Sequence, residues 1–456
     1  MKTNFYFLLI LSFCFTLSFS KLISVIEVNR HGARSSENFP EAPLQQFFGI
    51  SMKLTNNGYR QHQLLGSYMN ARYVKTNFIN SVYRPSDFQI ISTPTQRTVY
   101  SADGFISGLY PGHVVRATYH EPNLNLISND TIPVIDPPSN YKEIPLTVLS
   151  WVENSIFNSW NCKLNGEILK PKSENKTTYP DLLPITDEEM TFAAKYLANF
   201  FNITEIVNDF EPRAFMKQVN KYIITYFYHF GLKMEEILPS KVVEVVKKMY
   251  VNKWYSSRIE DSQLLKLGAS ELFEKINEIF TKAVNSRKNF LKPKIGNTKY
   301  TVYSSHDTAI VNIISNLLDG EYLRKIVNTA VDNQSSYDFL VPPFASNVLF
   351  ELHFSREKQQ YYVMVLYNGR VINHTLRGMN KSYDDGKIPL EDFMKFMKSR
   401  IDEDYKRLDC SEAIKEERLK MFPILKKKQS KNKLKGAQDA ELMSSLLSLN
   451  KLVYDN

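Results

Sequence analysis

Residues 23–34, with the sequence ISVIEVNRHGAR, decide the fold class of this chain. The first six form a mostly apolar run rich in isoleucine and valine, which is typical of a buried β-strand. This run leads directly into a polar cluster that contains Arg30, His31 and Arg34. Three chemically active side chains therefore stand at the end of a predicted strand.

The same order of strand and polar cluster occurs twice more in the chain. Residues 88–91 predict a strand and are followed by a helix start, Ser-Thr-Pro, with Arg97 in its first turn. Residues 300–303 predict a third strand, which leads to His306, Asp307 and an apolar helix. Strands that alternate with helices indicate an α/β protein, here a mixed sheet flanked by helices. Reacting groups in such sheets gather beyond the carboxyl ends of the strands, so we expect the three clusters to converge there.

The region between the second and third clusters has a different pattern. Residues 150–290 show mostly helical spacing of apolar side chains, so we expect an inserted, mainly helical cap. The α/β body is then discontinuous and comprises residues 21–149 and 291–423. Within its second part, residues 348–354 and 361–367 predict a closing pair of strands.

Two runs of large side chains support the helical prediction for this region. Thr186 and Glu189 form a capping box, a polar pattern that begins a helix. The run after it contains Phe192, Tyr196 and Phe200. A second run has the three-to-four spacing of an apolar helix face: Met216, Val219, Ile223, Phe227 and Phe230. We expect both runs to belong to the core rather than to a cofactor site.

The first twenty residues predict that the protein is exported. Lys2 precedes an almost wholly apolar run at 5–19, and small side chains stand before Lys21. This is the pattern of a secretory signal peptide over residues 1–20, with cleavage after Ser20. An uncleaved membrane anchor is the alternative, which the small residues after the apolar run disfavour. No later stretch of about 18 apolar residues exists, so we expect no transmembrane helix.

The net charge of +9 does not indicate a nucleic-acid partner, because of where the charge lies. Six lysines without an acidic residue between them fall within residues 426–435, and they account for two thirds of the excess. A run of this kind is typical of a solvated tail. We therefore expect residues 424–456 to be a basic, disordered tail; attraction to an anionic membrane or polymer is the alternative.

Cysteine usage agrees with export. After removal of the signal peptide the chain keeps only Cys162 and Cys410, which can form at most one intramolecular disulfide. Two unpaired thiols are the alternative. Six Asn-x-Ser/Thr triplets are candidates for glycosylation: Asn129, Asn175, Asn202, Asn333, Asn373 and Asn380. Such triplets also arise by chance, so they support export without establishing it.

The first polar cluster has the residue types that phosphoryl transfer requires. A phosphoryl group in transfer carries negative charge on three oxygens. Arg30 and Arg34 can clamp those oxygens, because a guanidinium is always charged and offers a planar fork of donors. A neutral His31 can attack phosphorus and later leave, and Gly32 removes a Cβ where substrate and backbone come close. A surface histidine between two solvated arginines is the alternative interpretation.

The other two clusters supply the remaining groups. Arg97 can be a third guanidinium on the phosphate, and His306 can donate a further hydrogen bond. Asp307 is placed to protonate a departing alkoxide and later to deprotonate the attacking water. An aspartate at a helix start is often only a cap, so Asp307 gains its significance from His306 and from the first cluster.

The other histidines show no spacing that is typical of metal ligands. They are His62, His113, His120, His229, His353 and His374. We interpret His62 as an ordinary residue of a helix. We therefore expect no metal, and activity that survives a chelator.

Three segments of the chain resemble the signatures of the histidine acid phosphatases, in the same order. They are residues 26–36 (IEVNRHGARSS), 92–102 (STPTQRTVYSA) and 303–309 (YSSHDTA). Residues 54–73 and 342–353 are also similar to this family. The lysosomal and prostatic type is the most similar, and the resemblance extends over residues 22–410.

This resemblance implies an acid phosphatase that hydrolyses phosphate monoesters through a covalent phosphohistidine at His31. It implies Asp307 as the proton donor, no metal or other cofactor, and a disulfide that joins Cys162 to Cys410. The phosphate pocket would be formed by four side chains: Arg30, Arg34, Arg97 and His306. The partner would be a small phosphomonoester and the location lysosomal or secreted, while a homodimer stays open.

The chain departs from the family in two respects. It has fewer cysteines than the animal members, and a lysine-rich tail stands where the lysosomal form has a C-terminal membrane anchor. The pair His306 and Asp307, rather than a His-Ala-Glu triplet, favours a broad acid phosphatase over one large class of phytases. Because an aspartate acts as the acid, we expect an optimum around pH 4–6.

Two alternatives to a broad acid phosphatase stay open. One is a phosphatase with the same mechanism that is specialised for inositol polyphosphates or lysophospholipid phosphates. The other is a catalytically vestigial secreted glycoprotein that binds acidic surfaces through its tail. A panel of phosphoesters tests the first, and deletion of residues 424–456 tests the second.

Overall fold

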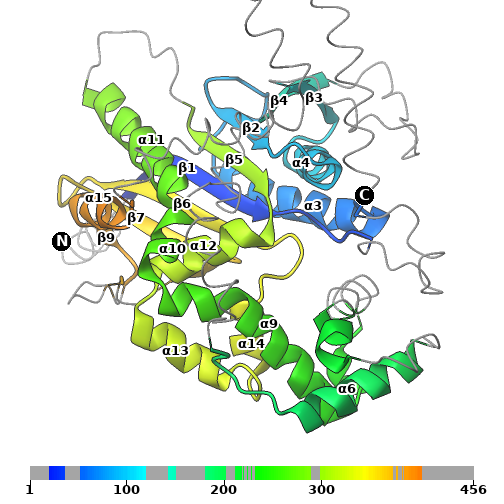
Figure 1. Ribbon diagram of the computed structural model, residues 1–456. Helices are drawn as coiled ribbons and strands as arrows, with labels where there is room; N and C mark the ends of the chain where they lie inside the picture. The colour runs from blue at the N-terminus through cyan, green and yellow to red at the C-terminus, as the bar shows by residue number, and fades with distance from the viewer. Residues whose placement is uncertain are drawn as a thin grey trace, which may run out of the picture.

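A mixed β-sheet lies at the centre of the fold, with helices on both of its faces (Figure 1). The computed structural model describes the following residues: 20–35, 52–119, 142–149, 180–201, 211–217, 219, 223, 227, 232–288, 298–372, 376, 377, 383 and 385–402. The predicted α/β class, with a mixed sheet flanked by helices, is confirmed.

Nine strands form this sheet within the described residues. They are β1 (Ser20–Arg30), β2 (Phe88–Ser92), β3 (His113–Tyr119), β4 (Lys142–Val148), β5 (Tyr300–Ser305), β6 (Asn347–Ser355), β7 (Gln360–Tyr367), β8 (Arg370–Val371) and β9 (Ile388–Pro389). Their order is β3-β4-β2-β5-β1-β6-β7-β8, and β9 pairs with β7. The strands from β3 to β1 in this order are parallel, whereas β6 to β9 pair antiparallel. The five predicted strands correspond to β1, β2, β5, β6 and β7.

The described helices cover the faces of this sheet and extend beyond it. They are α3 (Asn56–Met69), the π-helix η1 (Asn70–Val74), α4 (Gln96–Leu109), α6 (Asp187–Phe200), α8 (Met234–Ile237), α9 (Ser240–Glu260), α10 (Ser262–Leu267), α11 (Ser270–Lys288), α12 (Asp307–Leu317), α13 (Gly320–Thr329), α14 (Gln334–Leu340) and α15 (Leu390–Ser399). The apolar helix predicted after the third cluster is α12, and it begins at Asp307.

The parallel pairing of β1, β5 and β2 brings the three polar clusters to one edge of the sheet. Arg30 pairs with Ser305, and Ser92 pairs with Ser304, so the ends of the three strands lie level. The pairing continues by one residue, because His31 N donates to Ser305 O (2.9 Å). The predicted convergence of the clusters is confirmed.

Successive residues of β1 face opposite sides of the sheet, as the pleat of a strand requires. Val25 packs into the core on the side of α3 and α4, whereas Ile26 and Val28 pack on the side of α9, α11 and α12. All three side chains are fully buried. Burial on both faces is expected of a central strand in the parallel part of a sheet.

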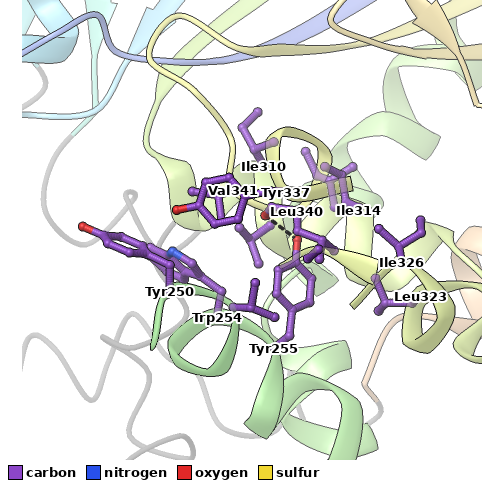
Figure 2. Packing of buried hydrophobic residues seen from close by; sticks show 14 of the residues in the cluster. Tyr250, Trp254, Tyr255, Ile310, Ile314, Leu323, Ile326, Tyr337, Leu340 and Val341 are labelled. Atoms are coloured by element: carbon purple, nitrogen blue, oxygen red, sulfur yellow. Dashed lines mark hydrogen bonds between the residues drawn. The ribbon is translucent and has the colours of Figure 1, made fainter. Parts of the chain in front are cut away.

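Helix α9 is fixed against the helix that carries Asp307. The hydroxyl of Tyr255 on α9 donates to Leu340 O of α14 (2.7 Å), and its ring lies among apolar side chains of α12, α13 and α14 (Figure 2). On the same helix, Arg258 Nε donates to Asn312 Oδ1 of α12 (2.9 Å). These contacts join the helices of this face into one packed layer.

The described part of the range predicted as an insertion, residues 150–290, is helical and contains α6 and α8 to α11. Helix α11 contacts β1 and α15, so this helix packs on the sheet. Helix α6 contacts α9. The division between an α/β body and a cap at residue 290 stays a prediction.

Two of the three aromatic side chains predicted for the core on α6 lie outside it, so the prediction is wrong for Phe192 and Phe200, whereas Tyr196 packs against the core. The side chains of Phe192 and Phe200 are 46% and 38% exposed. The buried stripe of α6 is formed by other residues: Met190, Ala193, Ala194 and Leu197. Since a helix presents only one face to its neighbour, α6 buries this stripe and leaves Phe192 and Phe200 at the surface. The capping box of Thr186 and Glu189 is confirmed.

The second apolar run is buried where the structure describes it. Met216, Val219, Ile223 and Phe227 are at most 1% exposed. Several other predictions fall on residues that the structure does not describe. These are the signal peptide up to residue 19, the tail 424–456, Phe230, Cys162, Cys410, Asn129, Asn175, Asn202, Asn373 and Asn380.

Asn333 is the one candidate for glycosylation that lies within the described residues. Its side chain is exposed at the start of α14, where Oδ1 accepts a hydrogen bond from Ser336 N (3.0 Å). Glycosylation modifies the nitrogen of this amide, so the cap is compatible with it. Among the helices that the structure describes, none is long and apolar enough to cross a membrane.

Candidate active site

The loop after β1 is held in place by α3 and α4. Gly32 N donates to Ser101 Oγ of α4 (3.0 Å), and Ala33 N donates to Gln61 Oε1 of α3 (2.8 Å). A Cβ on Gly32 would lie 2.1 Å from Gly58 O, so only glycine allows this close approach of backbones. The loop therefore presents its side chains from a fixed position.

The ring of His31 is oriented by its own loop. Nδ1 lies 2.8 Å from Gly32 O, and because a carbonyl oxygen only accepts, Nδ1 carries the hydrogen. The lone pair of the neutral ring is therefore on Nε2. The residue is 3% exposed, and burial, together with the charge of Arg97, lowers the pKa of His31 well below its usual value. The ring is thus neutral and nucleophilic at mildly acid pH.

Arg30 is held from three sides beside this ring. Its Nη2 lies 3.0 Å from Asp307 Oδ2, and its Nη1 donates to Pro342 O. Its guanidinium carbon lies 4.2 Å from the centroid of the Phe344 ring. The backbone is fixed as well, since His62 Nε2 donates to Arg30 O (2.9 Å). These contacts fix the direction of the Arg30 guanidinium.

Arg34 and Arg97 complete the positive surroundings of His31. Arg34 Nη1 donates to Ser35 O (2.8 Å), and Arg97 Nη2 lies 3.5 Å from His306 Nδ1. Burial lowers the pKa of both histidines, and the charges of Arg97 and Arg34 lower it further. The structure therefore brings together all the side chains that the sequence predicts for a phosphate pocket.

The ring of His306 lies beside that of His31. The two ring centroids are 5.4 Å apart in an edge-to-face arrangement. Burial and then the charge of Arg97 lower the pKa of His306 to about 3, so this ring is also neutral at mildly acid pH. Its Nε2 lies 3.0 Å from Thr93 Oγ1, directly after β2. Both of its nitrogens therefore have partners: Thr93, which lies between β2 and α4, and Arg97 in the first turn of α4.

Asp307 is the first residue of α12 and lies against Arg30. Its Oδ1 accepts a hydrogen bond from Thr308 N (2.9 Å), and its Oδ2 pairs with Arg30. Burial raises the pKa of Asp307, but attraction to Arg30 and to Lys253 of α9 outweighs burial, so the net shift is downward. These charges therefore favour the ionised form of the carboxyl.

Three neighbours of the site were not identified from the sequence: Gln61, His62 and Thr93. Gln61 holds the loop, His62 holds the carbonyl of Arg30, and Thr93 contacts His306. Burial lowers the pKa of His62 to about 4, so it acts as a neutral donor rather than as an ordinary helix residue. All three lie in segments that resemble the family, but their roles depend on how α3 and α4 pack against the loop.

Two other histidines lie apart from this site. His113 Nδ1 is 3.2 Å from Tyr110 O, and His353 Nε2 is 3.0 Å from Glu351. In the part of the chain that the structure describes, no group of three or more His, Cys, Asp or Glu side chains could hold a metal ion. That the reaction requires no metal stays a prediction.

The arrangement combines a neutral nucleophile, a cluster of cations and a carboxyl group. The guanidinium groups of Arg30, Arg34 and Arg97 can hold a tetrahedral oxyanion with its central atom beside His31. The carboxyl of Asp307 can then exchange a proton with an oxygen of that anion. This is the set of groups that transfer of a phosphoryl group through a histidine requires.

Comparison with known families agrees with this geometry. The family model described as "Histidine phosphatase superfamily (branch 2)" matches residues 21–368. The matched range contains every residue of the site described above, from Arg30 to Phe344.

Individual relatives are more distant. The prostatic acid phosphatase of Bos taurus is 24% identical over 402 residues, which cover 84% of this chain and 86% of that protein. The lysosomal acid phosphatase of Rattus norvegicus is 33% identical over 115 residues, 24% of this chain and 26% of that protein. Among solved structures, the phytase of Citrobacter braakii is 14% identical with a TM-score of 0.53, covering 86% of this chain and 99% of the phytase. At this identity, the likeness to the phytase shows the fold alone.

Proposed function

The chain belongs to the histidine phosphatase superfamily (branch 2), and we propose that it hydrolyses small phosphate monoesters at acid pH through a covalent phosphohistidine on His31. Membership of the family supports phosphatase activity; the nucleophile and the substrate class are the proposal. One observation carries it. His31 Nδ1 lies 2.8 Å from Gly32 O, so the lone pair of a buried, neutral ring is on Nε2, among three guanidinium groups.

In the first step the lone pair of His31 Nε2 attacks phosphorus. The phosphoryl oxygens are held by the guanidinium groups, which neutralise the charge that develops on them. The bond from phosphorus to the ester oxygen breaks in line with the attack. The proton of Asp307 passes to that oxygen, so the alcohol leaves neutral and Asp307 becomes a carboxylate.

In the second step a water molecule replaces the alcohol. The oxygen of this water attacks phosphorus, and the carboxylate of Asp307 takes a proton from the water at the same time. The bond between phosphorus and His31 breaks, and the electron pair returns to Nε2. Orthophosphate leaves, and the starting protonation of both residues is restored.

Small phosphate monoesters are the substrate class that the comparisons support best. The chain is similar to prostatic acid phosphatase over most of its length, whereas its likeness to a phytase concerns the fold. Inositol polyphosphates and lysophospholipid phosphates are the alternatives for the same mechanism. Relative kcat/KM for an aryl phosphate, an inositol polyphosphate and a lysophosphatidate decides among them.

We also propose that the protein works in the secretory pathway, in a lysosome or outside the cell. The support is the predicted signal peptide and the similarity to prostatic and lysosomal acid phosphatases. The disulfide between Cys162 and Cys410 and the glycosylation of the six asparagines belong to this proposal. Mass spectrometry of the secreted protein under non-reducing conditions tests both.

The mechanism is tested by His31→Ala with an aryl phosphate at about pH 5. Loss of the nucleophile should lower kcat on the order of 10⁴-fold or more. His113→Ala is the matched control, because His113 lies on β3, away from the site, and should keep the parent rate. Rapid quenching of the parent protein during turnover should yield a phosphoryl adduct that is labile in acid and stable in base. A His31→Ala variant that turns over at the parent rate contradicts the proposal.

A vestigial binding protein would give a different pattern. The parent chain would then hydrolyse none of the phosphoesters, and deletion of residues 424–456 would abolish its binding to anionic vesicles. An enzyme should instead keep its kcat after the same deletion. Turnover and vesicle binding of the parent and of the shortened chain therefore distinguish an enzyme from a binding protein.

A further inference from the structure

A chain of threonine hydroxyls lies behind His306. Thr93 is fully buried directly after β2, where its N donates to Ser304 O (3.2 Å). Its Oγ1 lies 3.0 Å from His306 Nε2 and 2.8 Å from Thr98 Oγ1. Thr93 therefore connects the ring of His306 to a second buried hydroxyl.

The far end of this chain is fixed by backbone acceptors. Thr98 Oγ1 is 2.9 Å from both Thr93 O and Thr95 O. It also lies 2.8 Å from Thr95 Oγ1. Since a hydroxyl has one hydrogen and two lone pairs, Thr98 can donate either to a carbonyl or to Thr93. The hydroxyl of Thr93 can accordingly point in either direction along the chain.

Two hydrogen arrangements fit these distances. In the first, His306 Nε2–H donates to Thr93, and His306 Nδ1 accepts from Arg97 Nη2 at 3.5 Å. In the second, Thr98 donates to Thr93, Thr93 donates to His306 Nε2, and the hydrogen of the ring is on Nδ1. The second arrangement directs two donors, Nδ1–H and Arg97, toward the same space, so it requires an anion between them.

We propose that Thr93 is a positioning residue whose hydroxyl stabilises the Nδ1–H tautomer of His306, in which this ring donates to a phosphoryl oxygen. The inference rests on the proposed function and explains how a neutral histidine joins the phosphate pocket. Both tautomers are neutral, so no net proton is taken up, and they exchange through solvent water. The pKa of His306, which burial and then Arg97 lower to about 3, agrees with a neutral ring at mildly acid pH.

Only a hydroxyl meets this requirement at position 93. A backbone carbonyl would accept only, and it would hold the hydrogen on Nε2. A methyl group in place of Oγ1 would leave a buried ring nitrogen without a partner when an anion binds. Valine has the shape of threonine without the hydroxyl, and serine keeps the hydroxyl, so these two substitutions separate packing from hydrogen bonding.

The test uses Thr93→Val, Thr93→Ser and the matched control Thr95→Val. Thr95 contacts the same Thr98 Oγ1 but has no hydrogen bond to His306 among those of the described residues. The readouts are KM and kcat with an aryl phosphate, the dissociation constant of inorganic phosphate, and the ¹⁵N shifts of His306 with phosphate bound. The thermal midpoint of each variant reports on folding.

We expect Thr93→Val to raise KM and the dissociation constant of phosphate about tenfold. A factor of this size corresponds to the loss of one hydrogen bond that supports the contact of His306 with a charged ligand. Thr93→Ser should restore both, and Thr95→Val should leave both within about twofold of the parent. The ¹⁵N shifts of the parent should show a protonated Nδ1 in the phosphate complex.

Three results would overturn the inference. They are unchanged phosphate affinity in Thr93→Val, an equal loss in Thr95→Val, and a phosphate complex in which Nε2 of His306 carries the hydrogen. Failure of the proposed function has a different signature. If the parent protein binds inorganic phosphate but hydrolyses no phosphoester, the proposed function fails, while the phosphate affinities and the ¹⁵N shifts still test the role of Thr93.

Discussion

The guanidinium Nη2 of Arg30 lies 3.0 Å from the carboxylate Oδ2 of Asp307. This ion pair joins a predicted phosphate ligand to the predicted proton donor. Burial raises the pKa of Asp307, but attraction to Arg30 and Lys253 holds the net value below the usual range. A proton donor must carry a proton, so binding of the substrate has to raise the pKa of Asp307. An anion does so by adding negative charge next to Arg30.

We therefore predict that binding of a dianion is accompanied by proton uptake at Asp307. Sulfate is a suitable probe, because at about pH 5 it carries no proton of its own to release. Calorimetric titration in two buffers of different ionisation enthalpy should show net proton uptake by the parent protein. Asp307→Asn should bind sulfate without net proton uptake. Equal uptake by the two proteins would contradict the coupling.

The role of Asp307 as a general acid predicts a dependence on the leaving group. An alkoxide requires a proton as it departs, whereas the anion of an acidic phenol does not. Asp307→Asn should thus lower kcat for an alkyl phosphate by about 10²- to 10⁴-fold and for p-nitrophenyl phosphate much less. Steady-state kinetics on the two substrates measures the ratio. The same loss on both would mean that Asp307 has another role.

A chelator should leave turnover unchanged. The proposed steps use an imidazole, guanidinium groups and a carboxyl, and none of them requires a Lewis acid. Dialysis against EDTA, followed by an assay with an aryl phosphate with and without added Zn²⁺ or Mg²⁺, makes the comparison. A loss of activity that one of these ions restores would show that a metal takes part.

Glu27 is a buried acid four residues before His31. Tyr300 of β5 and Asn347 of β6 donate to its carboxylate, and Asn29, two residues further along β1, is a third hydrogen-bond partner. Burial outweighs these hydrogen bonds and raises the pKa of Glu27 to about 7. The folded protein therefore favours the protonated form, which the unfolded chain loses above its ordinary value of 4.5.

The sign of this effect predicts a fold that is more stable in acid. The contribution of Glu27 is fully present below about pH 4.5 and is lost as the pH rises through about 7, a difference of about 3 kcal/mol. Glu27→Gln imitates the protonated form. Its free energy of unfolding should therefore fall less than that of the parent protein as the pH rises over this range. Urea unfolding of both proteins at about pH 5 and about pH 7.5 gives the difference. Parallel pH dependences of the two proteins would refute it.

The sheet and the site cluster could be predicted from the sequence because both follow from local pattern. The apolar runs before Arg30, Ser92 and His306 identify three strands, and the parallel order of an α/β fold makes their ends meet. No long-range information was required to place these groups at one edge. The pairing of Arg30 with Ser305 bears this out.

The features that the sequence did not reveal depend on how helices pack. Phe192 and Phe200 have helical spacing, but which stripe of α6 is buried depends on its neighbour α9. Helix α11 has an ordinary apolar face, and nothing in that pattern shows that it lies on the sheet. Likewise, the contacts of His62 and Thr93 with the site depend on the positions of α3 and α4 rather than on local spacing.

The close approach of α3 to the loop after β1 gives the last prediction. A Cβ on Gly58 would lie 2.1 Å from Ala33 O and 2.6 Å from Ala33 N, both of them backbone atoms that cannot turn aside. Gly58→Ala must therefore separate α3 from the loop. This change should lower the free energy of unfolding by about 1–3 kcal/mol or more. It should also lower kcat, because the same helix holds Ala33 N through Gln61 and the carbonyl of Arg30 through His62.

The matched control for this change is Gly320→Ala, also at the start of a helix. A Cβ there would meet its nearest neighbour, the guanidinium of Arg377, at 3.7 Å, an ordinary contact distance. Alanine favours a helix over glycine, so this variant should be as stable as the parent or more stable by up to about 1 kcal/mol. Thermal unfolding and aryl phosphate turnover of the two variants make the comparison. If Gly58→Ala were as stable and as active as Gly320→Ala, the loop would not depend on contact with α3, and the rigid placement of His31 would require another cause.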